Sequence, residues 1–280
     1  MNNAMQLKAK IKNVAAEKNV SPQLVLQNYM LERLLKHISI SKYRNNLIIK
    51  GGLLISSMIG VDFRTTMDMD TTIKSLPLDE NSIRDLFEQI CVIDTDDNIA
   101  FRVDRVESIR EDDPYSGFRV HLLAAFDPMS VPVKVDVTTG DAITPKEIDF
   151  EYRPMFSDEV IPIKSYNLET LLAEKLETII SRSVQNTRSR DFYDIYILEK
   201  LFDGRIDYVL LATAIEATAS KRGSTEAIMD YREILKEIEG DETMNARWIG
   251  YTKEYSYTAG IDFKDTIISA KRLLDKAGKV

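Results

Sequence analysis

The chain has 280 residues, 44% of them hydrophobic, enough for two domains that each have a core. One cysteine, Cys91, excludes an intramolecular disulfide, and with two histidines, His37 and His121, the chain lacks a Cys/His cluster of zinc-ligand spacing. The net charge is -8, yet residues 1–45 alone sum to +6, which indicates either a solvated helix face or a surface for RNA or another partner.

The first twenty residues carry frequent charges and have no apolar segment of the kind that directs secretion. No stretch approaches the roughly 20 apolar residues that span a bilayer. A single thiol also suits a reducing compartment. We therefore expect a cytoplasmic protein with no membrane partner.

Up to about residue 164, short runs rich in β-branched residues alternate with amphipathic segments. The runs predict strands at 46–50, 67–74, 100–109, 117–126, 131–139 and 160–164. The amphipathic segments predict helices at 6–17, 22–38, 53–58 and 81–91. Ser21 is the expected N-cap of the second helix, with Pro22 at its first position.

Beyond residue 165 the apolar residues follow the helical period almost throughout. One helix is predicted around residues 168–179, and others at 191–201, 206–219, 225–238 and 263–277. The expected fold class is α+β, with a mixed sheet and flanking helices in residues 1–164 and a helical bundle in residues 165–280.

Two carboxylates lie close together in the segment MDMDTTIK, residues 67–74. Because strand side chains alternate between faces, Asp68 and Asp70 share one face, about 7 Å apart, while Met67, Met69 and Ile73 share the buried one. Divalent cations prefer such oxygen ligands. A solvent-facing acidic edge explains a lone pair of this kind equally well.

The segment VPVKVDVTT, residues 131–139, repeats this pattern. Its valines form one apolar face, which leaves Lys134 and Asp136 on the other. If the two strands are neighbours, Asp136 joins Asp68 and Asp70, and three carboxylates can hold two cations for an in-line displacement at phosphorus.

A glycine pair, Gly51 and Gly52, follows a predicted strand and precedes a predicted helix. Glycines allow close backbone approach, and free amides at a helix start bind phosphate, so a triphosphate can bind here. A plain strand-to-helix turn is the alternative.

Lys175 lies in the middle of the apolar face of its predicted helix, where a charged residue is unexpected. Either it extends to the surface through its stem, or it reaches phosphate or a carboxylate in a cleft. Downstream, Arg188 and Arg190 precede Asp191 and Asp194. Helix capping accounts for the two acids, while the arginines are suited to hold phosphate.

Together these residues resemble the AbiEii family of nucleotidyltransferase-like toxins, over about Ile48 to Leu198. The matching positions form four ordered motifs: Gly51, Gly52, Arg64, Thr65, Asp68 and Asp70; Lys134, Asp136, Gly140 and Asp141; Lys175 and Leu176; and Arg188, Arg190, Asp191, Tyr193 and Asp194. Arg190 departs from the family's usual lysine but keeps the charge.

The resemblance implies a DNA polymerase β-like nucleotidyltransferase fold that uses an NTP substrate and Mg²⁺ or Mn²⁺. It implies transfer of NMP to RNA, at the 3′ end of tRNA, in phage abortive infection. It also implies a cognate antitoxin with a winged-helix DNA-binding region, with or without a stable direct contact.

The resemblance assigns roles to individual residues. Asp68, Asp70 and Asp136 would bind metal, and Gly51, Gly52, Arg64, Thr65 and Lys134 would bind nucleotide. Lys175, oriented by Asp191, would neutralise charge during catalysis. Two alternatives remain open: a transferase that modifies a small molecule such as an antibiotic, and a non-catalytic protein that binds GTP or another NTP.

Overall fold

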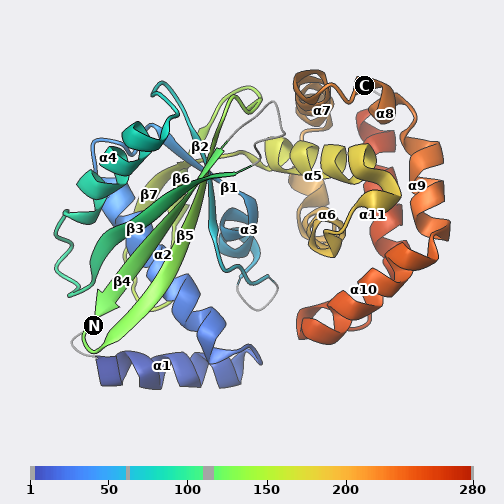
Figure 1. Cartoon of the computed structure of the whole chain (residues 1–280). Helices are drawn as coiled ribbons and strands as arrows, with labels where there is room; N and C mark the ends of the chain where they lie inside the picture. The colour runs from blue at the N-terminus through green and yellow to red at the C-terminus, as the bar shows by residue number, and fades with distance from the viewer. Residues whose placement is uncertain (1–3, 61–63, 110–116, 279–280) are drawn as a thin grey trace. The chain divides into compact units, whose positions relative to one another are not determined.

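The computed structural model describes residues 4–60, 64–109 and 117–278 (Figure 1). The chain divides into two units, one comprising Met1–Gly140 and Ile148–Ser165 and the other Asp141–Glu147 and Tyr166–Val280. All strands of the described residues belong to the first unit, and the described part of the second unit is built from helices.

A seven-stranded mixed sheet forms the centre of the first unit, in the order β3-β4-β5-β2-β1-β7-β6. β2 is parallel to β5 and β1 is parallel to β7, whereas the other neighbours are antiparallel. The strands are β1 (Leu47–Lys50), β2 (Met69–Ile73), β3 (Ala100–Ile109), β4 (Gly117–Phe126), β5 (Met129–Thr139), β6 (Ile148–Tyr152) and β7 (Ile161–Ser165).

All six strands predicted from the sequence are present. β6 was not predicted, because it lies at the edge of the sheet and most of its side chains are exposed or half-exposed, which removes the apolar alternation. One burial prediction is wrong: Met67 precedes β2 instead of lying in it, and it is 46% exposed, whereas Met69 and Ile73 are buried.

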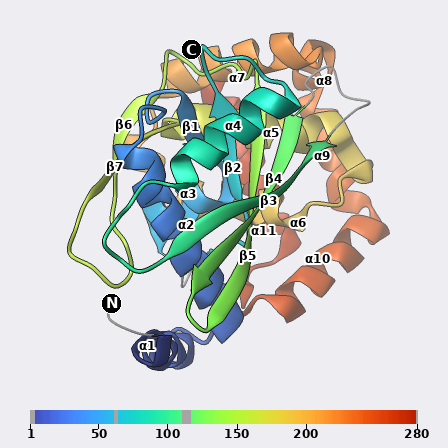
Figure 2. The ribbon, with the colours of Figure 1, turned by 60° about the vertical axis from the view of Figure 1, so that its left-hand side comes forward.

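Four helices complete the first unit: α1 (Ala4–Glu17), α2 (Pro22–Ile40), α3 (Gly51–Ile59) and α4 (Glu80–Cys91). α2 packs against β5 and β7, α3 against β1 and β2, and α4 against β3 and β4; the turned view in Figure 2 shows α4 beside these strands. Ser21 caps α2, as predicted, because its side chain accepts a hydrogen bond from the Leu24 amide. α3 begins at Gly51, so the glycine pair forms its first turn.

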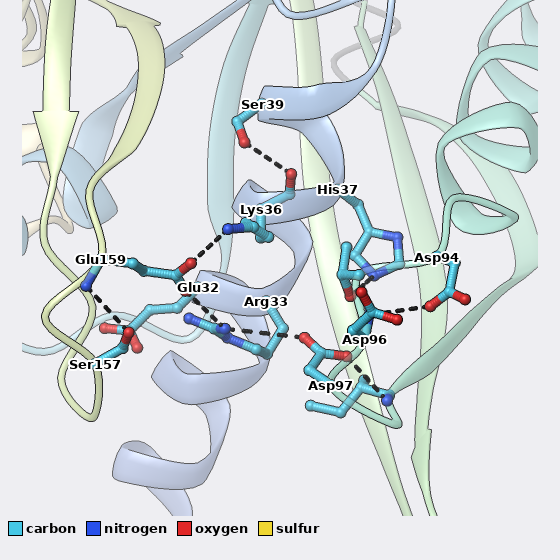
Figure 3. A network of polar contacts seen from close by, with 12 residues as sticks. Glu32, Arg33, Lys36, His37, Ser39, Asp94, Asp96, Asp97, Ser157 and Glu159 are labelled. Carbon is cyan, nitrogen blue, oxygen red and sulfur yellow. Dashed lines mark hydrogen bonds and ion pairs between the residues drawn. The ribbon is translucent and has the colours of Figure 1, made fainter.

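Charged side chains of α2 lie within a buried polar network of the first unit (Figure 3). Arg33 is 7% exposed, and its Nη1 lies 3.1 Å from Glu159 Oε1 and 3.9 Å from Asp97 Oδ2. Lys36 also pairs with Glu159. Part of the positive charge of residues 1–45 is therefore neutralised inside the unit, while Lys8, Lys10 and Lys12 of α1 stay exposed.

The second unit contains α5 (Leu168–Arg182), α6 (Ser189–Phe202), α7 (Tyr208–Arg222), α8 (Thr225–Met229), α9 (Tyr231–Gly240), α10 (Glu242–Glu254) and α11 (Phe263–Ala277). α5 packs against α6 and α7, and α11 packs against α6, α7 and α9. The apolar face predicted for α5 is buried, because Leu171, Leu172, Leu176 and Ile179 are at most 1% exposed.

Two predictions for the second unit need correction. The helix predicted at 225–238 is two helices, α8 and α9, which meet at Asp230, a residue type that favours helix ends over interiors. α10 was not predicted, because only Met244 and Trp248 of its residues are buried and the apolar periodicity is weak. Asp241 caps α10 by accepting a hydrogen bond from the Met244 amide at 2.8 Å.

The mixed sheet with flanking helices, followed by a helical region, confirms the predicted fold class. Among the helices of the described ranges, none combines the length and the apolarity that crossing a membrane requires.

Candidate functional site

One row of charged residues crosses five neighbouring strands of the sheet. Paired Cα positions run from Glu107 in β3 to Arg119 in β4, then to Asp136 in β5, Asp70 in β2 and Lys50 in β1. Residues opposite one another in adjacent strands project from the same face of a sheet. We call these five residues the charged row, in which Asp136 and Asp70 are the two adjacent residues of like charge.

The structure places the predicted carboxylates as follows. Asp70 and Asp136 are neighbours in the parallel pair of β2 and β5, as alternation along the two strands predicted. Asp136 is 8% exposed, and Asp70 is half-buried. Asp68 precedes β2 and is also half-buried, and Thr66 Oγ1 donates to its carboxylate at 3.1 Å. Two of the three predicted ligands are thus adjacent, and the third lies two residues before Asp70.

Arg119 holds both oxygens of Asp136. Its Nε donates to Oδ1 at 2.7 Å and its Nη2 donates to Oδ2 at 2.8 Å. The hydrogen bonds to Asp136 raise the pKa of Arg119 above its usual value, and the negative charges of Asp136, Asp68 and Glu107 act in the same direction. The Arg119 side chain is 34% exposed, whereas that of Asp136 is only 11% exposed.

Sequence reasoning missed Arg119, although a signal was present. β4 and β5 form a hairpin in which Phe126 and Met129 flank the two-residue turn Asp127–Pro128. Counting outward from such a turn fixes the register of the hairpin and pairs Arg119 with Asp136. Lys50 offered no comparable signal, because a helix and a loop separate β1 from β2.

The glycine pair lies against the predicted carboxylates. Gly51 has φ +65°, a backbone conformation that residues other than glycine rarely adopt. A Cβ built there would lie 2.0 Å from Asp70 Oδ2. A Cβ at Gly52 would lie 2.8 Å from Thr66 Oγ1 and 3.1 Å from Arg64 Nη2. The start of α3, where backbone amides lack helical partners, therefore adjoins Asp70.

Arg64 and Thr65, predicted to contact nucleotide, are buried, at 3% and 5% exposure, and the Arg64 guanidinium lies close to Gly52. Arg64 Nη1 donates to the Thr65 carbonyl. The next carbonyl, that of Thr66, accepts from Asn28 Nδ2 at 3.1 Å. These contacts fix residues 64–66, which precede Asp68.

A row of basic residues runs beside the charged row. Lys134 is exposed, lies two residues before Asp136 on the same face of β5, and pairs with His121 of β4, which pairs with Arg105 of β3. His121 Nε2 lies 2.7 Å from Glu107 Oε1. Lys134 therefore places a positive charge next to the adjacent carboxylates, an arrangement that suits a polyphosphate, whereas Arg105 and His121 both contact Glu107.

The remaining predicted residues lie in the second unit, in a group that we call the ion cluster: Lys175, Arg188, Asp191 and Asp194. Lys175 Nζ lies 2.5 Å from Asp191 Oδ1 and 2.9 Å from Asp194 Oδ2, and Arg188 Nε lies 2.9 Å from Asp191 Oδ2. Lys175 is 7% exposed and both aspartates are fully buried. The charged partner expected for Lys175 is thus Asp191, with Asp194 as a second one. Arg190, by contrast, is exposed.

The carboxylates of the first unit are chemically suited to Mg²⁺ or Mn²⁺, which prefer carboxylate oxygens. In the arrangement observed, Arg119 occupies both oxygens of Asp136. Accordingly, among residues 4–60, 64–109 and 117–278, the structure assembles no group of three or more His, Cys, Asp or Glu side chains ready to hold a metal ion.

Comparisons with known proteins agree with the fold. Two solved structures from Helicobacter pylori resemble the chain, one described as a candidate nucleotidyltransferase and one as JHP933. The first has 13% identity and a TM-score of 0.52, and covers 93% of this chain and 98% of its own. The second has 14% identity and a TM-score of 0.51, and covers 92% and 95%. At this identity they support the fold alone.

A family model matches residues 33–267, and it is described as Nucleotidyl transferase AbiEii toxin, Type IV TA system. No curated protein matches the chain. The matched range includes the charged row and the ion cluster.

Proposed function

The chain belongs to the AbiEii family of nucleotidyl transferase toxins of type IV toxin–antitoxin systems, and on this premise we propose that it transfers NMP from an NTP to an RNA acceptor, the 3′ end of tRNA. The observation that carries this proposal is the adjacency of Asp70 and Asp136 beside Gly51 at the start of α3. Carboxylates next to free helix amides suit a metal-bound triphosphate.

The reaction breaks one bond and forms another at the α-phosphorus. The acceptor hydroxyl attacks this phosphorus, the bond to the oxygen that bridges to the β-phosphate breaks, and pyrophosphate leaves with that oxygen. The proton of the hydroxyl passes to solvent or to a carboxylate of the row. In-line displacement of this kind depends mainly on positioning and on neutralising charge.

Each predicted site residue of the first unit has a proposed role in this chemistry. The amides that follow Gly51 and Gly52 hold phosphate oxygens, and Lys134 neutralises part of the charge of the triphosphate. Arg64, which lies close to Gly52, and Thr65, whose carbonyl accepts a hydrogen bond from Arg64, bind the nucleotide beside the glycine pair. Mg²⁺ or Mn²⁺, held by Asp68, Asp70 and Asp136, would supply positive charge at the reacting phosphate.

A catalytic part for Lys175 and Asp191 stays a prediction. Their contacts with each other and with Asp194 already account for their burial. Loss of transfer in a Lys175 variant that keeps its thermal stability would favour a catalytic part, and loss of both together would favour a structural one.

The biological setting completes the proposal. We infer that a cognate antitoxin, with a winged-helix DNA-binding region, neutralises the toxin, with or without a stable contact, and that the pair acts in phage abortive infection in the cytoplasm. The exposed lysines of α1 offer positive charge to RNA phosphates. Growth arrest on expression, relieved by the antitoxin, is the expected result.

The transfer is tested with the full chain, total tRNA, Mg²⁺ and each labelled NTP in turn. We expect the wild type to extend a small RNA and Asp70→Asn to leave it unlabelled. Asp85→Asn, the same change at an exposed position of α4, is the matched control and should retain transfer. If no NTP labels RNA, the proposed acceptor is wrong, and a labelled small molecule would support the antibiotic-type alternative.

A further inference from the structure

We propose that Arg119 is a resident cation for Asp136, which a divalent metal must displace, so that Arg119 sets how tightly the site binds metal before a nucleotide arrives. This inference rests on the proposed metal-dependent transfer, because it assigns Asp136 as a metal ligand. It adds Arg119, which neither the motifs nor the predicted roles include.

The first step is the occupancy of the carboxylate. Arg119 donates to both oxygens of Asp136, at 2.7 and 2.8 Å, in the two-point geometry that a guanidinium fork makes with a carboxylate. A cation that binds Asp136 needs at least one of these oxygens. Binding of the metal and the observed pairing therefore compete for the same atoms.

The second step is the need for such a partner. Asp136 is 8% exposed, and its neighbour across β2 is Asp70, a residue of the same charge. A buried carboxylate beside another carboxylate needs a cation to offset the repulsion between them. Arg119 supplies that cation in the metal-free chain.

The third step is that the Arg119 side chain has an alternative position away from Asp136. Its side chain is 34% exposed, so it can leave Asp136 without crossing the core. Glu107, its Cα partner on the other side, carries a carboxylate that is 43% exposed; it already contacts His121 and Arg105, and its exposed oxygens can take the guanidinium as a further partner. A planar guanidinium is also well matched to phosphate oxygens, so a bound triphosphate would favour the displaced position.

The experiment measures Mn²⁺ binding to the full chain by electron paramagnetic resonance of the free ion, without nucleotide. Arg119→Gln removes the competing cation, and we expect it to tighten the Mn²⁺ dissociation constant about tenfold. Arg119→Lys keeps the charge but loses the two-point geometry, and we expect a gain of about threefold. Binding by Arg119→Gln where the wild type binds too weakly to measure would be the same result in stronger form.

Lys134→Gln is the control for charge alone, because Lys134 lies exposed on the same face of β5. We expect it to change Mn²⁺ affinity by less than about twofold. An equal gain in Lys134→Gln and Arg119→Gln would overturn the inference, as would unchanged or weaker binding in Arg119→Gln. Asp136→Asn should weaken Mn²⁺ binding in the wild-type background, and its failure to do so would also overturn the inference.

Two further outcomes separate a folding defect from an effect on metal binding, and metal binding from the choice of acceptor. If thermal melting shows that Arg119→Gln does not fold, Arg119→Lys decides, and unchanged affinity in that variant overturns the inference. If Mn²⁺ binding responds as expected while no RNA is labelled, the acceptor proposal fails and the role of Arg119 stands.

Discussion

The charged row of the sheet and the ion cluster of the helical unit use the same residue types in different ways. In the row, Asp70 is half-buried and Arg119 is 34% exposed. In the cluster, Asp191 and Asp194 are fully buried, and Lys175 lies within 2.5 and 2.9 Å of their oxygens. The residues of the row can therefore exchange partners with a ligand from solvent. The charges of the cluster are already paired in the protein interior, where an unpaired charge would destabilise the fold.

This difference in burial suits the charged row to ligand binding and the ion cluster to a structural role. A carboxylate that water reaches, such as Asp70, loses little when its partner leaves. Asp136 is 8% exposed, so it can exchange Arg119 only for another cation, and the exposure of Arg119 allows that exchange. A carboxylate without water depends on its partner for most of its stability. The cluster joins α5 to α6, because Lys175 belongs to α5 and both aspartates belong to α6.

The largest expected effect is on the ion cluster. Lys175→Met removes the cation that contacts both buried carboxylates, and we expect it to lower the free energy of unfolding by about 3–5 kcal/mol. Urea unfolding followed by circular dichroism measures this. Lys264→Met, at a side chain 70% exposed that pairs with Glu239 at 3.2 Å, is the control and should cost less than about 1 kcal/mol. Equal losses in the two variants would break the comparison between buried and exposed pairs.

The next effect concerns a buried carboxyl that accepts hydrogen bonds from neutral groups. Glu32 of α2 accepts hydrogen bonds from Tyr152 Oη and the Met155 amide, each at 3.1 Å, and Arg33 beside it bonds instead to Glu159 (Figure 3). Burial raises the pKa of Glu32 from 4.5 to about 7, more than its hydrogen bonds lower it. The folded chain thus favours the protonated form of Glu32 at pH values below about 7.

The pH dependence follows from this raised pKa. The unfolded chain loses the Glu32 proton near pH 4.5 and the folded chain only near pH 7, so the contribution of Glu32 to stability is fully present below pH 4.5 and is lost as pH rises through about 7, by about 3 kcal/mol in all. Glu32→Gln should remove this fall, as measured by urea unfolding from about pH 5 to about pH 8. Glu17→Gln, at an exposed position of α1, should retain it. A fall that persists unchanged in Glu32→Gln would rule out this origin.

The sequence predicted those parts of the fold that depend on local periodicity. Alternation along β2 and β5 placed Asp70 and Asp136 on one face, and the helical period exposed Lys175 as a charge within an apolar stripe. Both inferences need only neighbouring residues. The strand β6 and the helix α10 escaped because few of their side chains are buried, so they leave little apolar pattern.

What the sequence did not predict depends on register between distant segments. Lys50 joins the charged row only because β1 pairs with β2 in one register. Asp194 was noted as a helix-terminal acid, but its bond to Lys175 depends on how α5 packs against α6. The exposure of Met67 was also not predicted. Met67 fits the alternation that includes Met69, but the strand begins only at Met69, so Met67 lies outside it and is exposed.

The smallest expected change in stability is at the charged row itself. Asp70→Asn removes a charge on which the proposed transfer depends. We nevertheless expect the free energy of unfolding to change by less than about 1 kcal/mol. Asp70 is half-buried, so water compensates much of its charge, and the amide keeps its shape beside Gly51. The loss of repulsion from Asp136 and the loss of attraction to Lys50 also oppose each other, because both are its register neighbours. Urea unfolding of Asp70→Asn beside Lys175→Met measures the contrast directly. A loss in Asp70→Asn as large as that in Lys175→Met would mean that the row holds the sheet together as the ion cluster holds its helices, and that its carboxylates are not free to exchange partners.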